Sequence, residues 1–348
     1  MKKNGLNILF RTAGGKAPKK ELGLGHVFRC LNLASELKGN KIHFLLEDFG
    51  GAKKIVLQRG YQNIRVLKKE IDLKQDLKIV QKYIKNKKID LLIVDRYHVK
   101  IPYLKKLQKL VKLVVISDLQ NFEFPGDLVV NGFIGFNNKV KKNSFGTKCL
   151  LGPHYQILNK KFSERSIRKK QKFDLLVTVG GFDEKNIIDV FLKCLEPNIT
   201  KIKTKIILGP ATSKSKLTKM LEKKYPSNLK IIKSTMDMKQ EISKTRFGIC
   251  SGGITTYEFA SMKKPFGIIS HVDHQLITAS EWEKKGYAKN LGKVGRKTQK
   301  DIKNLLNKIV LGQIPYKIKN KNLVDGKGCL RVSREILKFS NYSKDGYQ

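Results

Sequence analysis

Long apolar runs are missing from this chain of 348 residues. No stretch of about 18 uncharged apolar residues occurs, so the sequence predicts no transmembrane helix. The apolar part of the N-terminal segment is too short for a signal peptide, and we expect it to lead directly into a strand. Low-complexity segments and detectable repeats are also lacking. Hydrophobic residues still make up 40% of the chain, which excludes wholesale disorder.

Cysteine is scarce, and no two cysteines have CxxC spacing. The odd number and wide separation of the five exclude a disulfide framework and a zinc cluster. Each lies in an apolar segment, so we expect buried, reduced thiols and a cytoplasmic protein. The five are Cys30, Cys149, Cys194, Cys250 and Cys329.

Acidic residues are also few. The chain has 29 Asp and Glu and 72 Lys and Arg, so its formal net charge is +43. This balance favours polyanionic partners such as nucleic acid, acidic membrane or phosphorylated ligands. However, the lysines are spread through nearly every segment, and the chain has no familiar nucleic-acid-binding module. We therefore expect lysines on all solvated faces and no nucleic-acid partner. A basic nucleic-acid-binding protein is the remote alternative.

Short β-rich runs alternate with amphipathic helical segments in both halves of the chain. Strands are predicted at 6–11, 42–46, 64–67, 91–94 and 114–116, and the pattern restarts at 173–179. Continuous apolar strands separated by helices predict parallel sheets covered on both faces. The length agrees with two domains of about 150 residues each. The fold class is therefore α/β, with two tandem Rossmann-like domains.

A basic segment with little apolar content, 160–172, is interpreted as the linker between the two halves. This places the N-terminal domain at 1–159 and the C-terminal domain at 173–312. The remaining residues, 313–348, are interpreted as a C-terminal tail.

The segment after the first strand contains Gly23, Gly25 and His26. The glycines permit close approach of a ligand to the backbone. Phe28 occupies the place of the third glycine of the dinucleotide fingerprint, so NAD binding is not expected. His26 stands at the carboxyl edge of the predicted sheet, where open α/β proteins bind ligands, and its imidazole can take a proton near neutral pH. A histidine that only caps the helix is the alternative.

Polar residues follow the next strands. Asp95 ends the strand at 91–94, with Tyr97 close behind. A carboxylate at this edge can orient a histidine or bind a sugar hydroxyl, or it can be a structural cap. Asp118, after the next strand, has the same two interpretations. Tyr155 either lines an interdomain cleft or packs structurally.

The most informative motif of the second half, 251–258, joins a predicted strand at 247–250 to a helix. Its two glycines and its hydroxyl side chains can cradle a diphosphate with backbone amides. It is not a Walker loop, because no GK[ST] follows. Glu258, one turn into the helix, can accept hydrogen bonds from ribose hydroxyls or interact with the helix dipole.

Three further features accompany this motif. Gly180 and Gly181 end a strand and suggest backbone contact with a ligand, while Asp183 beside them can instead cap the next helix. Two histidines and an aspartate within 271–274 have a spacing that invites a metal. No other motif supplies matching ligands, so no metal is predicted.

Five segments together resemble a known family. They are FRTAGG with GLGHVFRCLNLA, VDRY, LLGPHYQILNKKF, VTVGGFDEKN, and SGGITTYEFASMKKPFGII followed by HQ. They occur in the order seen in the UDP-sugar hydrolases of pseudaminic acid biosynthesis, which act on UDP-2,4-diacetamido-2,4,6-trideoxy-β-L-altropyranose. The wider group includes spore-coat polysaccharide biosynthesis proteins and is similar to glycosyltransferases of the GT-B fold. The resemblance covers roughly residues 6–285.

The resemblance implies that His26 is the catalytic base, that the 251–258 segment holds the nucleotide diphosphate, and that Glu258 contacts the ribose. It also implies an interdomain cleft for the substrate. Candidate catalytic residues are then His26, Asp95 and Tyr97. Candidate substrate-binding residues are Gly23, Gly25, Arg29, Tyr155, Gly180, Gly181, Ser251, Gly252, Gly253, Ile254, Thr255, Glu258, His274 and Gln275.

Three departures from the family pattern fall on the predicted sugar side. Arg96 stands where the hydrolases commonly have His, His274 replaces the usual Asn, and an insertion occupies 16–21. We expect a monomeric enzyme without cofactor that hydrolyses a UDP-activated diacetamido-trideoxy sugar at the anomeric carbon. A GT-B glycosyltransferase with a UDP-sugar donor is the alternative, because both activities need one base and one diphosphate cradle.

Overall fold

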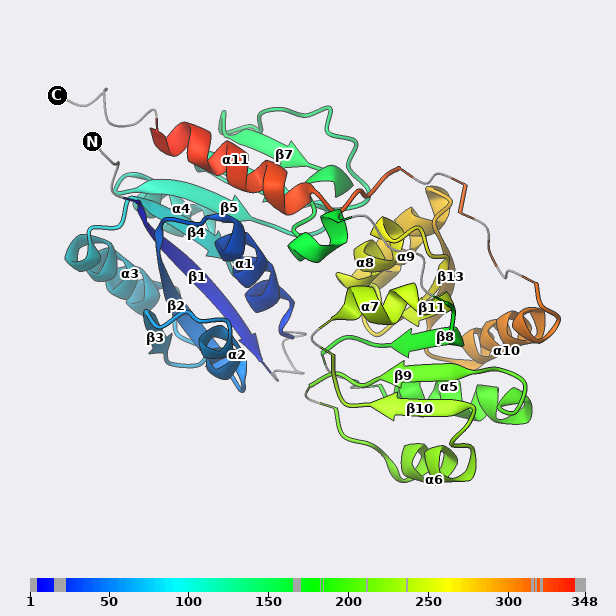
Figure 1. The fold of residues 1–348 in the computed structure, drawn as a ribbon. Coiled ribbons are helices and arrows are strands. Elements are labelled where there is room, and N and C mark those ends of the chain that lie inside the picture. The colour runs from blue at the N-terminus through cyan, green and yellow to red at the C-terminus, as the bar shows by residue number, and fades with distance from the viewer. Residues whose placement is uncertain are drawn as a thin grey trace. The chain divides into compact units, whose positions relative to one another are not determined.

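The computed structural model describes residues 5–15, 23–164, 170–181, 183, 185–210, 212–235, 237–313, 316, 318–319 and 322–341. The insertion at 16–21 lies outside the described residues. The chain divides into two compact units, the first formed by residues 1–160 and 327–348 and the second by 161–326. Each unit is a parallel α/β sheet with helices on both faces (Figure 1), so the predicted fold class is confirmed.

In its described part, the first unit has a sheet of seven parallel strands in the order β3-β2-β1-β4-β5-β6-β7. Most of their residues are buried, which is typical of strands covered on both faces. The strands are β1 (Asn7–Gly15), β2 (Lys41–Phe49), β3 (Ile64–Leu67), β4 (Leu91–Asp95), β5 (Lys112–Ile116), β6 (Leu128–Asn131) and β7 (Lys148–Leu151).

Helices pack on both faces of this sheet because alternate strand residues point to opposite sides. Ile8 and Phe10 of β1 share one core with α1, α2 and α11, whereas Leu9 joins the core under α3 and α4. The helices are α1 (Gly25–Glu36), α2 (Ala52–Gln58), α3 (Leu73–Lys87), α4 (Ile101–Gln108) and α11 (Gly328–Asn341), with 3-10 turns η2 (Pro153–Tyr155) and, at the boundary with the second unit, η3 (Lys160–Ser163).

The second unit repeats the plan with a sheet ordered β10-β9-β8-β11-β12-β13, again parallel throughout its described part. Helices α5, α6 and α10 supply one apolar core. The strands are β8 (Phe173–Thr178), β9 (Thr204–Ile207), β10 (Leu229–Ile232), β11 (Thr245–Cys250), β12 (Phe266–Ser270) and β13 (Ala288–Lys293). The helices are α5 (Ile187–Leu195), η4 (Glu196–Asn198), α6 (Lys216–Lys224), α7 (Met238–Ser243), α8 (Thr255–Ser261), α9 (Asp273–Lys284) and α10 (Arg296–Val310).

The C-terminal segment differs from the predicted tail. Its helix α11 belongs to the first unit and buries Cys329, Val332 and Ile336 in the core beside α1. The interpretation of 313–348 as a tail is therefore corrected: a helix with an apolar stripe returns to cover the first sheet. The residues interpreted as a linker also include η3, whose Phe162 is buried.

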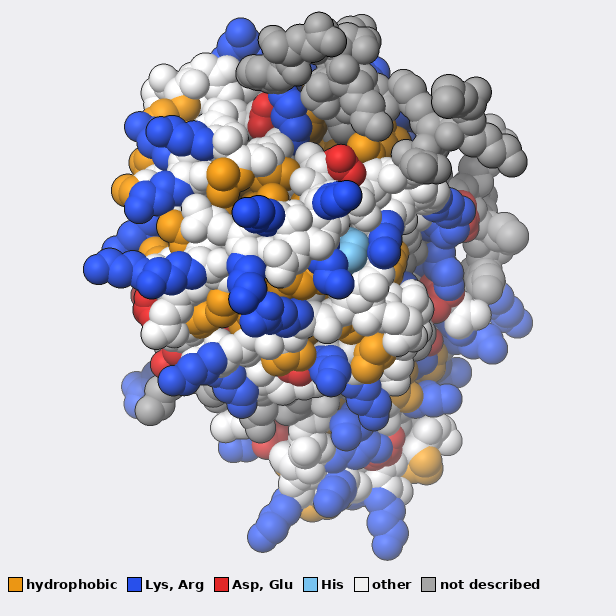
Figure 2. Space-filling model, turned by 90° about the vertical axis from the view of Figure 1, so that its left-hand side faces the viewer, with side chains coloured by type: hydrophobic (Ala, Val, Ile, Leu, Met, Phe, Trp, Pro, Cys, Tyr) orange, Lys and Arg blue, Asp and Glu red, His pale blue; other side chains and the backbone are white. Residues whose placement is uncertain are grey.

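Surface and core composition agree with the sequence in two respects. All five cysteines are free and buried. Lys and Arg side chains are scattered over the described part of the face shown in Figure 2, with few acidic side chains between them. Within the described residues, no helix has both the length and the hydrophobicity that crossing a bilayer requires.

Ile336 tests the role of α11, because its side chain is fully buried in the first unit. We expect Ile336→Ala to lower the free energy of unfolding of that unit by about 2–4 kcal/mol, the usual cost of a core cavity. The single tryptophan, Trp282, is buried in the second unit, so its fluorescence reports on that unit alone. Urea unfolding should shift when followed by circular dichroism and not when followed by Trp282 fluorescence.

The control is Lys338→Ala, which removes only an exposed ion pair with Glu335 on the same helix. If Ile336→Ala behaved like this control, α11 would not be part of the stable core.

Candidate active site

The strand order places two loop clusters where ligands bind in open parallel sheets. In the first sheet the order reverses between β1 and β4, and in the second between β8 and β11. Loops leaving the carboxyl ends of strands on either side of such a reversal diverge and leave a crevice. The segment containing His26 follows β1, and the 251–254 segment follows β11. Both predicted motifs therefore lie at a topological switch point.

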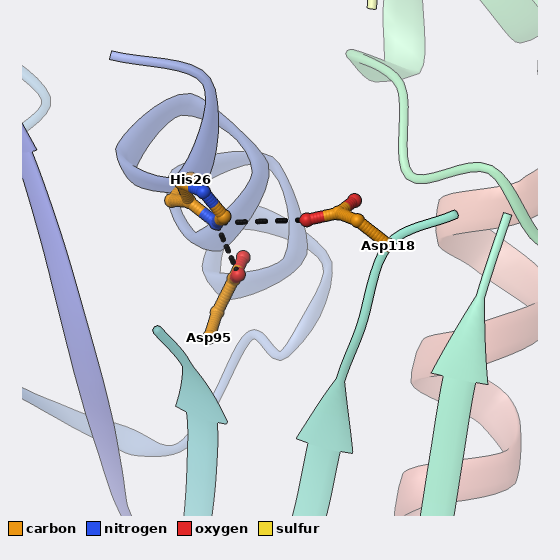
Figure 3. Close-up of side chains that lie close together, drawn as sticks. All are labelled: His26, Asp95 and Asp118. Atoms are coloured by element: carbon orange, nitrogen blue, oxygen red, sulfur yellow. Dashed lines mark hydrogen bonds and ion pairs between the residues drawn. The ribbon is translucent and has the colours of Figure 1, made fainter. Parts of the chain in front are cut away.

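His26 and Asp95 form the centre of the first cluster (Figure 3). His26 lies in the first turn of α1, Asp95 is the last residue of β4, and His26 Nδ1 is 2.6 Å from Asp95 Oδ1. Asp95 is completely buried, whereas the His26 side chain is 16% exposed. Because the ionised carboxylate only accepts hydrogen bonds, His26 Nδ1 carries the proton, and Nε2 is then free to exchange a proton with a ligand.

Arg29, one turn further along α1, holds two carboxylates in place. Its Nε donates to Asp95 Oδ2 at 2.8 Å and its Nη2 to Asp95 Oδ1 at 2.6 Å. The same guanidinium donates through Nη1 and Nη2 to both oxygens of Asp118, with an Nη2–Oδ2 distance of 3.0 Å. Arg29 was expected to bind substrate, but its side chain is buried and committed to these carboxylates.

The surroundings shift the pKa of each member of this cluster. Burial alone would lower the pKa of His26, but the charge and hydrogen bond of Asp95 outweigh it and the net shift is upward. Burial raises the pKa of Asp95 and Asp118, yet the Arg29 charge dominates and holds both below their ordinary values. Both carboxylates are therefore ionised at neutral pH, and the imidazole is a stronger base than a free histidine.

His26, Asp95 and Asp118 are also a candidate metal-binding group among the described residues, with ligand atoms within 4.8 Å of one another. Arg29 makes metal binding unfavourable, because its guanidinium already hydrogen-bonds to both carboxylates. A divalent cation would have to displace that guanidinium or tolerate its charge. The chemistry of the cluster thus fits proton transfer better than metal binding.

The other predicted residues of the first unit differ in their surroundings. Gly23 and Gly25 flank the start of α1, and an added Cβ would meet no atom within 4 Å at either. Tyr97 is exposed, and its ring centroid is 6.3 Å from that of His26. Tyr155 packs against the first core and accepts a hydrogen bond from Asn138 Nδ2 at 3.3 Å.

In the second unit, the loop after β11 exposes its backbone. Within the described part of the chain, the N–H groups of Gly252, Gly253 and Ile254 donate to no protein acceptor. Gly253 is exposed, and a Cβ there would meet nothing within 4 Å. A Cβ on Gly252 would lie 2.8 Å from Gln275 Cβ, so that glycine permits packing against α9. The loop can therefore offer consecutive amides to an anion.

The glycines after β8 lie against this loop. Gly180 has a positive φ of 86°, and a Cβ there would approach the hydroxyl of the buried Ser251 at 3.4 Å. A Cβ on Gly209 would collide with the carbonyl oxygens of Gly180 and Gly181. Close backbone packing therefore requires these glycines. Asp183 accepts hydrogen bonds from the N–H groups of Ile187 and Ile188 and so caps α5.

Glu258 and Gln275 have contrasting environments. Burial raises the pKa of Glu258 to about 7, although a hydrogen bond with Thr255 opposes the shift. Gln275, predicted to contact substrate, accepts a hydrogen bond from the His271 N–H through Oε1 at 2.9 Å. Its neighbour His274, in the first turn of α9, is half-buried.

Arg96 requires a correction, because it was assigned to the sugar side of the site. Its side chain instead donates to Asp76 Oδ2 at 3.2 Å and lies 3.2 Å from Glu47 Oε2. The sequence alone does not decide between a structural and a functional role for Asp118. Its position after β5, adjacent to β4, was the signal that could have grouped it with Asp95, since neighbouring parallel strands end at one edge.

Sequence relatives agree with the predicted resemblance. The chain is 28% identical to spore coat polysaccharide biosynthesis protein SpsG of Bacillus subtilis, over 90% of this chain and 94% of that protein. It is 24% identical to the UDP-2,4-diacetamido-2,4,6-trideoxy-beta-L-altropyranose hydrolase of Campylobacter jejuni, over 81% of this chain and 98% of that protein. The predicted family resemblance is confirmed. No protein-family profile matches the chain.

Solved structures with the GT-B fold superpose on this chain. A complex of Staphylococcus aureus MnaA with UDP superposes with a TM-score of 0.61 at 13% identity, covering 99% of both chains. The spinosyn rhamnosyltransferase SpnG with thymidine diphosphate has a TM-score of 0.57 at 12% identity and 96% coverage of both chains. At these identities the likeness establishes the fold alone.

The raised pKa of His26 can be measured directly by NMR titration of the imidazole. We expect Asp95→Asn to lower it, because the charge and hydrogen bond that favour the imidazolium are weakened while burial and Arg29 still oppose it. Asp118→Asn should lower it less, since His26 Nδ1 is 4.0 Å from Asp118 and 2.6 Å from Asp95. Equal shifts in both variants would contradict the assignment of Asp95 as the main partner.

Proposed function

We propose that the protein binds a UDP-sugar and hydrolyses it at the anomeric carbon. The second unit would hold the nucleotide and the first would supply the catalytic base. The observation that carries this proposal is the hydrogen-bonded His26–Asp95 pair at the switch point of the first sheet. The names of the two relatives support a reaction of a nucleotide-activated sugar in polysaccharide or diacetamido-sugar metabolism.

The proposed reaction transfers one proton and breaks one bond. Neutral His26 takes a proton from water through Nε2 while that water attacks C1 of the sugar. The C1–O bond breaks, and UDP leaves with the bridging oxygen. Asp95 stabilises the imidazolium that forms. Since Nε2 must start unprotonated, kcat/KM should rise with pH through the raised pKa of His26.

On the nucleotide side, the proposal uses the loop after β11. The backbone amides of Gly252, Gly253 and Ile254, which have no acceptor among the described residues, suit the diphosphate, and Glu258 is assigned to the ribose. The first turn of α9, with His274 and Gln275, is assigned to the sugar end. Amides that are already aimed at the phosphates need little reorganisation when charge develops on the leaving group.

A glycosyltransferase is the second candidate, because the same pair could take a proton from an acceptor hydroxyl. The fold is shared with a rhamnosyltransferase that binds thymidine diphosphate, which favours this candidate. Both reactions release UDP. Only the hydrolase releases it without an acceptor.

Gly253→Val tests the diphosphate assignment. The residue has open space around it, so we expect a folded protein whose affinity for UDP falls about 10-fold or more, equivalent to about 1.4 kcal/mol. Isothermal titration with UDP measures the affinity. Gly295→Val is the matched control, because Gly295 lies in the same unit, has an extended backbone and has room for a side chain. Unchanged affinity in Gly253→Val would place UDP elsewhere.

The bond that breaks can be identified in ¹⁸O-water with a UDP-linked diacetamido sugar and no acceptor. We expect the label at C1 of the free sugar and none in the released nucleotide. We also expect His26→Ala to lower kcat about 10²–10⁴-fold with little change in UDP affinity, because loss of a general base affects the chemical step.

Label in the nucleotide phosphate would contradict attack at carbon. Turnover that appears only when an acceptor is added, with UDP still bound, would favour the glycosyltransferase. Near-normal turnover by His26→Ala would remove His26 from the mechanism.

A further inference from the structure

Asp95 and Arg96 are neighbours in sequence that point to opposite faces of the first sheet. Asp95 faces α1, where Arg29 and His26 bind its carboxylate. Arg96 faces α3, where Nη1 donates to Asp76 and Nη2 donates to the Ile71 carbonyl oxygen at 3.2 Å. The end of β4 is therefore held by charged side chains from both sides.

Arg96 belongs to a second set of charges, here called the buried charge cluster. Its members are Arg11, Glu47, Asp76 and Arg96. Arg11 of β1 donates to Asp76 Oδ1 and to Glu47 Oε2, each at 2.9 Å. Tyr103 of α4 donates to Asp76 Oδ2 at 2.8 Å. The cluster thus ties β1, β2, α3, α4 and the residue after β4 to one another.

The cluster is balanced and closely packed. Two guanidinium groups face two carboxylates, and the side chains of Arg11 and Asp76 are fully buried. The Arg96 side chain is 11% exposed. Asp76 accepts hydrogen bonds from Arg11, Arg96 and Tyr103. Glu47 accepts from Arg11 and from the Glu70 N–H at 2.9 Å, and it forms an ion pair with Arg96. Removing one member would leave buried charge without a partner, so the cluster fixes the positions of its members.

Arg96 occupies the place where strand pairing ends. Asp95 is the last residue of β4 to pair with β1, where it lies opposite Thr12, and Val94 is the last to pair with β5. The chain then turns, with His98 at a positive φ of 55°. No ladder partner holds the residue after Asp95 in the described sheet, and the Arg96 side chain supplies that anchor.

We propose that Arg96 is a positioning residue for the His26–Asp95 pair. It fixes the end of β4 from the α3 face and so keeps the Asp95 carboxylate within hydrogen-bond distance of His26. The proposal rests on the proposed function only for the catalytic use of His26. It also accounts for the position of arginine in the VDRY segment, since the side chain turns away from His26 and into the buried charge cluster.

The experiment is an NMR titration of His26, assigned by comparison with His26→Ala, in Arg96→Met and Arg96→Lys. We expect Arg96→Met to lower the pKa of His26 toward its value in Asp95→Asn, and Arg96→Lys to restore part of the shift. Tyr103→Phe is the matched control, because it removes a hydrogen bond from the same cluster at a residue remote in sequence from Asp95. It should leave the His26 pKa at the wild-type value.

Arg96→Met with Glu47→Gln restores the charge balance of the cluster and serves as the test should Arg96→Met fail to fold. A wild-type His26 pKa in a folded Arg96 variant would overturn the proposal, as would equal shifts in that variant and in Tyr103→Phe. With a UDP-sugar that the wild-type enzyme turns over, kcat should fall about 10- to 100-fold with little change in KM. Failure of the wild-type protein to turn over any UDP-sugar would contradict the proposed function and leave the pKa test intact.

Discussion

The contact of the Arg29 guanidinium with Asp95 is the interaction on which the first site depends. Burial raises the pKa of Asp95, and the Arg29 charge opposes that effect and keeps the carboxylate ionised. The ionised carboxylate in turn determines which nitrogen of His26 carries the proton. Without Arg29, Asp95 would be a buried charge facing a single imidazole. The geometry follows from helical periodicity, since His26 and Arg29 are three residues apart and face the same strand ends.

The sequence predicted the elements that carry periodic signals. Alternation of strands and helices predicted the fold class, and the glycine-rich loops predicted after two strands lie at the switch points that the strand order reveals. It missed β6 and β7, which have four residues each, because such short apolar runs are indistinguishable from loops that pack on a core. The packing of α11 on the first sheet could not be predicted either. An amphipathic helix shows which face it buries and not which sheet it covers.

Candidate residues were predicted less evenly than elements. His26 and Asp95 stood out because strand ends converge at one edge, and the structure brings them together. The sequence did not show which protein groups the side chains of Arg29, Arg96 and Gln275 bind, because a polar side chain near a strand end can contact a ligand or another part of the protein. Whether such a side chain contacts a ligand or another protein group depends on the face of the sheet to which it points. Adjacent residues such as Asp95 and Arg96 point to opposite faces.

The charge of the chain is distributed in a way that bears on its ligand. The formal net charge is +43, yet the His26 cluster contains two carboxylates and one guanidinium and is negative when His26 is neutral. A diphosphate would be poorly placed there, whereas sugar hydroxyl and amide groups can donate to Asp118, which is exposed. The free amides after β11 have the opposite preference. Local electrostatics, and not the net charge, therefore supports the proposed assignment of the sugar to the first unit and of the diphosphate to the second.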